Sequence, residues 1–164
     1  MRDGAGFDEF YATTTRTLVA QVYAMVGDLT EAEDAVAEAY SRAWQRWHQI
    51  HGYADPAAWV RTVAYRIAVS SWRRARNRRT AQQLSARAPV TQDASTLALV
   101  DALRNLPATQ RRALVLHHLV GMSVAEISIE TGGSVSAVKQ WLSRGRRALA
   151  IALGEDLEEA DSRA

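Results

Sequence analysis

The segment from residue 123 to residue 149 limits the possible folds most, because two helical patterns flank a break that a helix does not tolerate. Residues 123–129 form a short helical piece, and Gly132-Gly133 follows it. Ser134 then begins a second helix whose apolar face carries Val138, Leu142 and Leu149. Its other face has no acidic residue and carries Ser136, Lys139, Gln140, Ser143, Arg144 and Arg147. A helix, a glycine turn and a basic helix form the helix-turn-helix pattern, whose second helix enters a groove of DNA. The alternative is a basic surface helix exposed to solvent.

Helical spacing also extends through the first half of the chain. Apolar residues at steps of three and four predict helices over residues 7–26, 30–47 and 56–74. Thr30 and Glu33 have the spacing of a capping box, and Asp55-Pro56 suits the N-cap and first residue of the third helix. The residues between the second and third helices, 48–54, predict a loop.

The second half predicts a separate helical domain. Residues 80–93 lack periodicity and contain Pro89, so we expect a flexible linker there. Beyond it we predict a helix from about residue 94, one with Pro107 at its first position, one that begins at a capping box of Ser123 and Glu126, and the basic helix. No strand pattern occurs. The expected fold is all-α: a three-helix domain over residues 5–79, the linker, a four-helix domain over residues 94–154, and an acidic, disordered tail over residues 155–164.

Charge is distributed unevenly along the chain, although the net charge is only +2. Residues 56–92 contain eight arginines and no acidic residue, whereas residues 1–55 contain nine acidic residues and four arginines. Trp72 lies next to the arginine-rich end of the third helix, and interleaved aromatic and cationic side chains suit single-stranded nucleic acid. The basic middle block therefore predicts a polyanionic partner. For Trp59 we favour a core position.

Composition and motifs argue against catalysis. The chain has no cysteine, which excludes disulfides and thiolate zinc sites. His48, His51, His117 and His118 lack the further ligands that a metal site needs, and no nucleotide-binding, esterase or metalloprotease motif occurs. We therefore predict no enzyme and no cofactor. No apolar run is long enough to insert into a membrane, and the first ten residues do not resemble a signal peptide, so we expect a cytoplasmic protein.

The pieces taken together resemble the extracytoplasmic-function sigma factors of the bacterial sigma-70 family. Residues 28–38 and Arg42-Ala43-Trp44 look like region 2.2, and residues 55–60 with the helix that follows look like regions 2.3 and 2.4. Residues 102–111, 121–127 and 136–146 look like region 4. Gly132-Gly133 and Gln140-Trp141 depart from the family pattern, which more often has Leu-Gly and a smaller polar pair.

The resemblance implies a function and three groups of site residues. Region 2.2 binds the β′ coiled coil of core RNA polymerase, a role that falls here on Asp34, Glu38, Arg42 and Trp44. Capture of the unpaired −10 promoter strand falls on Gln49, Ile50, His51, Gly52, Tyr53, Arg61, Thr62, Tyr65, Arg66 and Arg73. Reading of the −35 duplex falls on Ser136, Lys139, Gln140, Ser143, Arg144 and Arg147. Region 4 also implies contact with the β flap through Leu114, Val115 and His118, and the family implies an anti-sigma factor as a further partner.

Two other functions stay open on the sequence. An autonomous helix-turn-helix regulator would use residues 1–80 as a sensor or dimerisation module and would bind duplex DNA without polymerase. A helical adaptor would use its basic segments for RNA or simply expose them to solvent.

Overall fold

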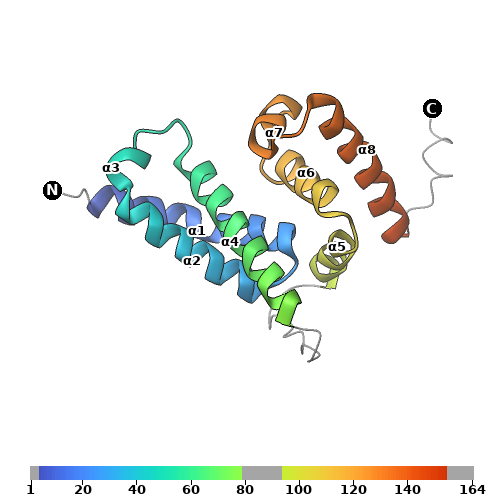
Figure 1. Cartoon of the computed structure of the whole chain (residues 1–164), viewed down its shortest axis with the longest axis horizontal. Coiled ribbons are helices and arrows are strands. Elements are labelled where there is room, and N and C mark those ends of the chain that lie inside the picture. Colours follow the sequence, from blue (N-terminus) through green and yellow to red (C-terminus); the bar gives the residue numbers. More distant parts are fainter. Residues whose placement is uncertain (1–3, 79–93, 155–164) are drawn as a thin grey trace. The chain divides into compact units, whose positions relative to one another are not determined.

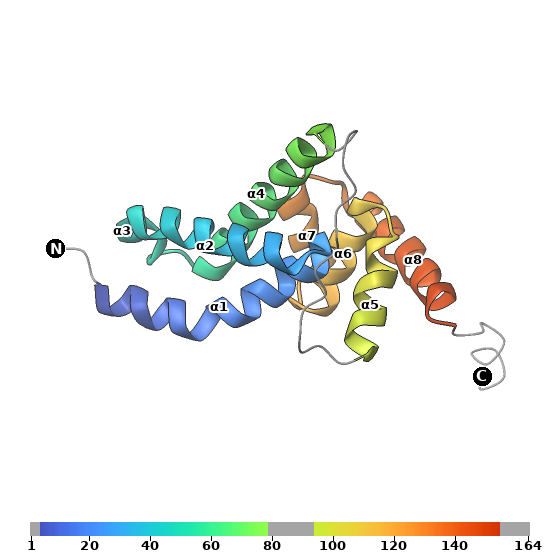
Figure 2. The ribbon, with the colours of Figure 1, turned by 90° about the horizontal axis from the view of Figure 1, so that it is seen from below.

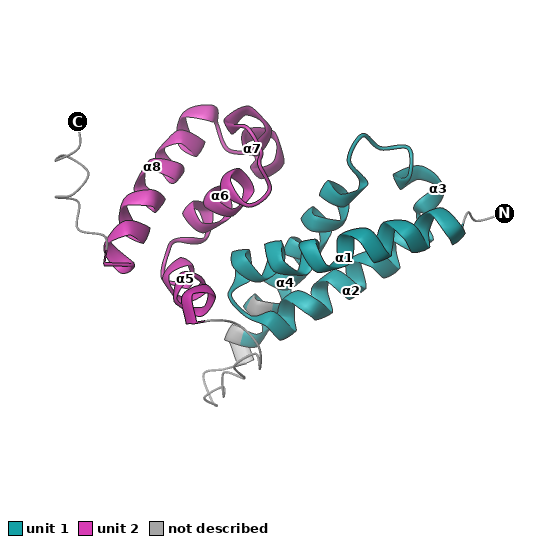
Figure 3. Cartoon of the chain, turned by 180° about the vertical axis from the view of Figure 1, so that it is seen from behind, with its two compact units in different colours: residues 1–90 teal, residues 91–164 magenta. Residues whose placement is uncertain are grey.

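A computed structural model describes residues 4–78 and 94–154 and divides the chain into two compact units, residues 1–90 and 91–164 (Figure 3). The described residues are helical, with no strand among them, which confirms the predicted all-α class. The predicted linker and the predicted acidic tail lie outside the described residues. No helix in the described parts of the chain is both long and apolar enough to span a bilayer.

The described part of unit 1, residues 4–78, contains three long helices and one short one (Figure 1). The long helices are α1 (Gly4–Val26), α2 (Leu29–Gln45) and α4 (Pro56–Arg78), and each packs against the other two. The short helix α3 (Trp47–Ile50) occupies part of the segment that the sequence predicted as a loop. Two perpendicular views place α3 beside the N-terminal end of α1 (Figures 1 and 2).

The start of α2 differs from the sequence prediction. The Asp28 carboxylate, not the Thr30 hydroxyl, caps the helix and accepts a hydrogen bond from the backbone N–H of Glu31 at 3.0 Å. Thr30 therefore lies inside the first turn, and the capping box predicted for Thr30 and Glu33 is wrong. At α4 the prediction is confirmed: Asp55 accepts from the Ala58 N–H at 3.0 Å, and Pro56 is the first helical residue.

Alanines make up much of the buried surface of α2 and α4, which pack closely against each other. We call the buried alanines of these two helices the alanine seam: Ala32, Ala35, Ala39, Ala43, Ala64 and Ala68. Helices that meet through small residues approach closely. Larger buried side chains, among them Leu18, Val22, Val36 and Val60, complete the core of the unit.

An aromatic cluster closes the end of unit 1 where α3 lies. The Phe7 ring meets Trp44 and Trp47 at centroid distances of 5.0 and 5.2 Å, and Phe10 stacks on Trp47 at 5.1 Å. The Tyr40 hydroxyl lies 2.6 Å from the Thr14 hydroxyl, so a hydrogen bond ties α2 to α1 beside the rings. Such ring pairs add roughly 0.5–1.5 kcal/mol each beyond their buried area. The cluster fixes the start of the segment that leads from α2 to α4.

Unit 2 contains α5 (Ala94–Arg104), α6 (Ala108–His118), α7 (Val124–Thr131) and α8 (Val135–Ala152). Helix α8 packs on the other three, and its core face buries Val138, Leu142 and Gly145. Pro107 occupies the N-cap position of α6 rather than the predicted first helical position. The capping box at Ser123 and Glu126 is confirmed.

Candidate nucleic-acid and partner interfaces

The turn between α7 and α8 fixes the direction of the basic helix. Gly132 ends α7 in the left-handed conformation, with φ of 76°, and its N–H donates to the Ser128 carbonyl. The Ser128 hydroxyl donates to the Gly133 carbonyl at 2.6 Å, which links α7 to the turn. Ser134 then caps α8 by accepting from the Ala137 N–H at 3.0 Å. Polar contacts therefore hold the turn at both ends, as a helix-turn-helix requires.

The exposed face of α8 carries every residue that the sequence assigned to −35 reading. These six side chains are exposed, whereas Val138 and Leu142 on the opposite face are buried: Ser136, Lys139, Gln140, Ser143, Arg144 and Arg147. Arginine and lysine donate to guanine and to phosphate, and glutamine pairs with adenine, so the face has the donors and acceptors that a major groove matches.

The segment after α3 divides into an anchored part and an exposed part. Gln49, His51, Gly52 and Tyr53 are exposed. Ile50, which the sequence assigned to DNA contact, is only 1% exposed, so it anchors the segment in the core and offers DNA no surface. The periodicity of a short segment does not reveal which apolar side chain turns inward. His51 Nδ1 lies 2.8 Å from the Trp47 carbonyl oxygen, which restrains the ring close to the buried indole.

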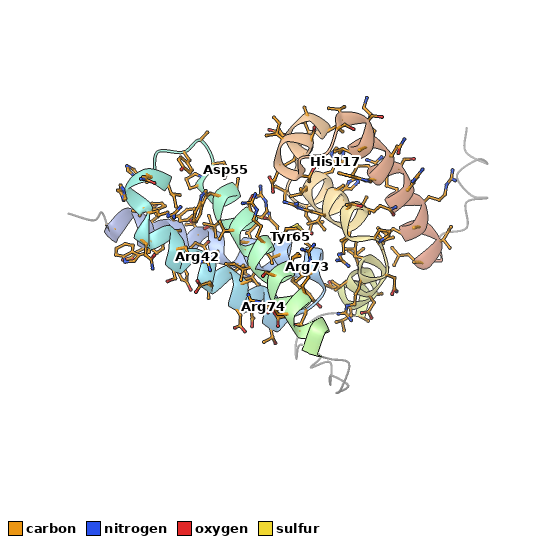
Figure 4. All side chains as sticks on the ribbon, in the orientation of Figure 1. Arg42, Asp55, Tyr65, Arg73, Arg74 and His117 are labelled. Atoms are coloured by element: carbon orange, nitrogen blue, oxygen red, sulfur yellow. The ribbon has the colours of Figure 1, made fainter. Side chains whose placement is uncertain are left out.

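Along α4 the predicted nucleic-acid residues also separate by burial. Arg66 and Arg73 are exposed, and Thr62 and Tyr65 are half-buried. Figure 4 labels Tyr65 and Arg73 on this helix. Arg61 is only 3% exposed, and this burial leaves almost none of its side chain accessible for the DNA contact that was expected of it. Exposed Arg74, absent from the predicted set, donates to the Ser70 carbonyl and hydroxyl at 3.4 Å. Because Arg74 directly follows the predicted Arg73 in the sequence, the same basic pattern could have predicted it as a nucleic-acid contact.

The predicted polymerase-binding residues lie along one helix. Asp34, Glu38 and Arg42 are exposed on α2, and Arg42 Nε pairs with Glu38 Oε1 at 2.9 Å. The fourth predicted residue, Trp44, is half-buried in the aromatic cluster. We call the exposed acidic and basic positions 34, 38 and 42 the α2 ridge.

A cavity of about 350 Å³ lies beside the α2 ridge, and no sequence signal indicated it. Its lining comes from both α2 and α4: Arg42, Gln45, Arg46, Trp59 and Val63. Trp59, expected in the core, is half-buried at this cavity.

The residues expected at the β flap are mostly inaccessible. Leu114 and Val115 belong to the core of unit 2, so the expectation that they form a contact surface does not agree with the structure. His118 is exposed, and its Nε2 accepts a hydrogen bond from Arg146 Nε at 3.3 Å. Desolvation, followed by the charges of His117 and Arg146, lowers the pKa of His118 below its ordinary value.

No three histidine, cysteine or acidic side chains come together as a possible metal site within residues 4–78 and 94–154. The arrangement instead offers three separate surfaces. One is the α2 ridge, one is formed by the segment after α3 together with α4, and one is the outer face of α8.

Comparison with known families identifies the family of both regions of the chain. Residues 10–78 match the family model described as "Sigma-70 region 2", and residues 96–149 match "Sigma-70, region 4". The ECF RNA polymerase sigma factor SigL of Mycobacterium tuberculosis is 33% identical over 140 residues, which cover 80% of this chain and 79% of SigL. This chain belongs to the extracytoplasmic-function sigma factors.

Other relatives and a solved fold agree with the assignment. The ECF RNA polymerase sigma factor BldN of Streptomyces coelicolor is 31% identical over 161 residues, covering 92% of this chain. The chain spans 61% of BldN, less than two thirds of that relative's length. The sigma factor RpoE of Bartonella quintana, solved with the anti-sigma factor NepR, has the same fold, with a TM-score of 0.76 and 22% identity. That structure covers 92% of this chain, and the match covers 98% of RpoE. Membership of this family does not support the autonomous regulator considered above.

Proposed function

We propose that this sigma factor directs core RNA polymerase to specific promoters and starts transcription there. The observation that carries the proposal is the separation of three exposed surfaces of different chemistry on a helical scaffold. The α2 ridge would bind the β′ coiled coil, the segment after α3 together with α4 would hold the melted −10 strand, and α8 would read the −35 duplex.

The −10 surface suits a strand whose bases are unstacked. Taking a base out of the duplex costs a few kcal/mol, which stacking on an aromatic ring and contacts to phosphate offset. Exposed Tyr53 and half-buried Tyr65 supply rings, and exposed Arg66 and Arg73 supply cations. Arg61 and Ile50 contribute through their burial, by holding α4 and the segment after α3 in place.

The −35 surface suits duplex DNA. Six exposed polar or basic side chains follow one face of α8, and no acid lies within that helix to repel phosphate. In this proposal the sigma factor itself performs no catalysis, because bond formation belongs to the polymerase with which it acts in the cytoplasm. An anti-sigma partner stays a prediction, and affinity purification of the tagged chain from its source cells tests it.

Run-off transcription with core polymerase and genomic promoter templates tests the proposed function. A promoter-dependent transcript is the expected result. Absence of both a transcript and core binding would contradict the proposal, and tight, specific duplex binding without polymerase would favour an autonomous regulator.

Paired variants separate the surfaces. Replacing Asp34 and Glu38 together by alanine should weaken binding to core polymerase and leave DNA binding unchanged. Asp8 is an exposed acidic residue on α1, so Asp8→Ala is the control and should change neither. Arg144→Ala should cost about 1–3 kcal/mol at one −35 base pair and spare core binding. Arg104→Ala, an exposed cation on α5, is its control. Unchanged core affinity after the double replacement would contradict the role of the α2 ridge.

A further inference from the structure

The indole of Trp141 lies against the backbone of the turn that precedes its own helix. A Cβ on Gly133 would lie 2.4 Å from Trp141 Cη2 and 2.8 Å from Cζ3, which is closer than such contacts occur. The ring therefore occupies the space that a side chain at position 133 would need.

The two glycines of this turn meet two different requirements. Gly132 has φ of 76°, a conformation that other residues rarely adopt, and a Cβ there would have nothing within 4 Å. Gly133 is not among the described glycines with positive φ. The backbone conformation thus favours glycine at 132, whereas the position of the Trp141 ring favours it at 133.

The direction of helical side chains explains how the ring reaches the turn. Trp141 lies seven residues after the cap Ser134, about two turns along α8, and side chains on a helix lean toward its N-terminus. Trp141 is half-buried, whereas its neighbour Gln140 is exposed on the face assigned to −35 reading. The ring thus points to the turn while the adjacent residue points to solvent.

The turn under the ring is attached to α7 by hydrogen bonds. The Gly133 carbonyl accepts from the Ser128 hydroxyl at 2.6 Å, and the Gly133 N–H donates to the Thr131 hydroxyl at 3.3 Å. A ring that packs on this backbone therefore restrains α8 relative to α7. The absence of a side chain at position 133 and the presence of an indole at position 141 are therefore structurally coupled.

We propose that Trp141 is a positioning residue for the −35 reader: it sets the place of the outer face of α8 by packing on Gly133. The base-reading part of this inference rests on the proposed function, whereas the packing part does not. Lys139, Gln140, Ser143 and Arg144 would make the contacts to DNA, and Trp141 would act through the turn.

A double-mutant cycle in the full-length chain tests the packing. Gly133→Ala should lower the urea midpoint measured by far-UV circular dichroism, and it should do so much less in a chain that also carries Trp141→Ala. Gly132→Ala is the matched control, because its cost comes from the backbone and should be equal in both backgrounds. Equal costs of Gly133→Ala in both backgrounds would overturn the proposal.

Holoenzyme transcription from a pool of promoters with randomised −35 sequences tests the reading. Trp141→Ala should broaden the preference at several −35 positions and leave core binding unchanged, Gly133→Ala should reproduce this change, and Trp141→Phe should restore part of the preference. Loss of preference at a single base pair in Trp141→Ala, with no effect of Gly133→Ala, would mean that Trp141 contacts a base and would overturn the positioning role. If the unaltered chain supports no promoter-dependent transcription, the proposed function and the reading role fail together, while the urea cycle still decides the packing.

Discussion

Ile50 and Tyr53 are three residues apart, but their side chains lie in opposite environments. Ile50 ends α3 and is 1% exposed, whereas Tyr53 follows α3 and is 49% exposed. We predict that truncation of Ile50 lowers the stability of unit 1, and that truncation of Tyr53 lowers binding of the −10 strand without affecting stability.

The expected magnitudes follow from burial. Ile50→Ala removes buried carbon atoms and leaves a cavity, at a cost of about 2–5 kcal/mol, and Ile50→Val costs about 0.5–1.5 kcal/mol. Tyr53→Ala, as a surface change, should alter stability by no more than about 0.5 kcal/mol. The stacking that it removes is worth about 1–3 kcal/mol per base, which corresponds to a loss of roughly 5- to 150-fold in affinity.

Two assays separate these effects. Tryptophan fluorescence in urea reports mainly on unit 1, because Trp44, Trp47, Trp59 and Trp72 belong to that unit and only Trp141 belongs to the other. Fluorescence anisotropy of a labelled single-stranded −10 oligonucleotide with holoenzyme reports on binding.

Ile50→Val should lower the urea midpoint and keep near-normal binding, and the exposed control His48→Ala should change neither quantity. Normal oligonucleotide binding by Tyr53→Ala, or an unchanged urea midpoint in Ile50→Ala, would refute the reasoning.

Three further changes probe unit 2 through its urea midpoint. Gly145→Ala should destabilise the unit by about 1 kcal/mol, because the new Cβ would lie 2.9 Å from Leu114 Cδ1 and the cost of overpacking should exceed the gain of roughly 1 kcal/mol in helix propensity. A raised urea midpoint would contradict the close approach of α6 and α8. The folded chain binds a proton at His118 more weakly than the unfolded chain does, because the pKa of His118 is lowered on folding. Stability should therefore decrease as the pH falls through about 6.5, the ordinary pKa of histidine, and His118→Gln should lessen this decrease. An unchanged pH dependence in that variant would rule out His118 as the cause. Ser123→Ala should cost about 1 kcal/mol through loss of the α7 cap, and a cost near zero would show that the cap is replaced by solvent.

Features set by neighbouring residues could be predicted from the sequence. The caps at Asp55 and Ser123 were predicted correctly because each depends on a side chain and a backbone N–H three residues later. The exposed face of α8 followed from helical spacing, since the buried positions Val138 and Leu142 determine which side faces outward.

Features that depend on the packing of distant segments could not be predicted in the same way. Arg61 and Arg66 lie on one helix and have the same chemistry, yet the first is buried and the second is exposed. The sequence predicted Thr30 as the cap of α2, whereas Asp28 caps it, because the position of the cap depends on where α2 begins in the folded unit. The contact of Trp141 with Gly133 needs the geometry of the turn, which composition does not supply.

The alanine seam has a consequence for the genetics of this protein. A larger residue at the fully buried Ala39 would overpack the core beneath α2, at a typical cost of about 1–3 kcal/mol, and would displace the α2 ridge on the outer side of the same helix. A screen for cells defective in polymerase recruitment should therefore recover substitutions at buried alanines together with substitutions on the ridge. The two classes would differ in how their defect depends on temperature. Substitutions in the seam would lose polymerase recruitment on warming, because they destabilise the unit, whereas substitutions on the ridge would lose it at every temperature.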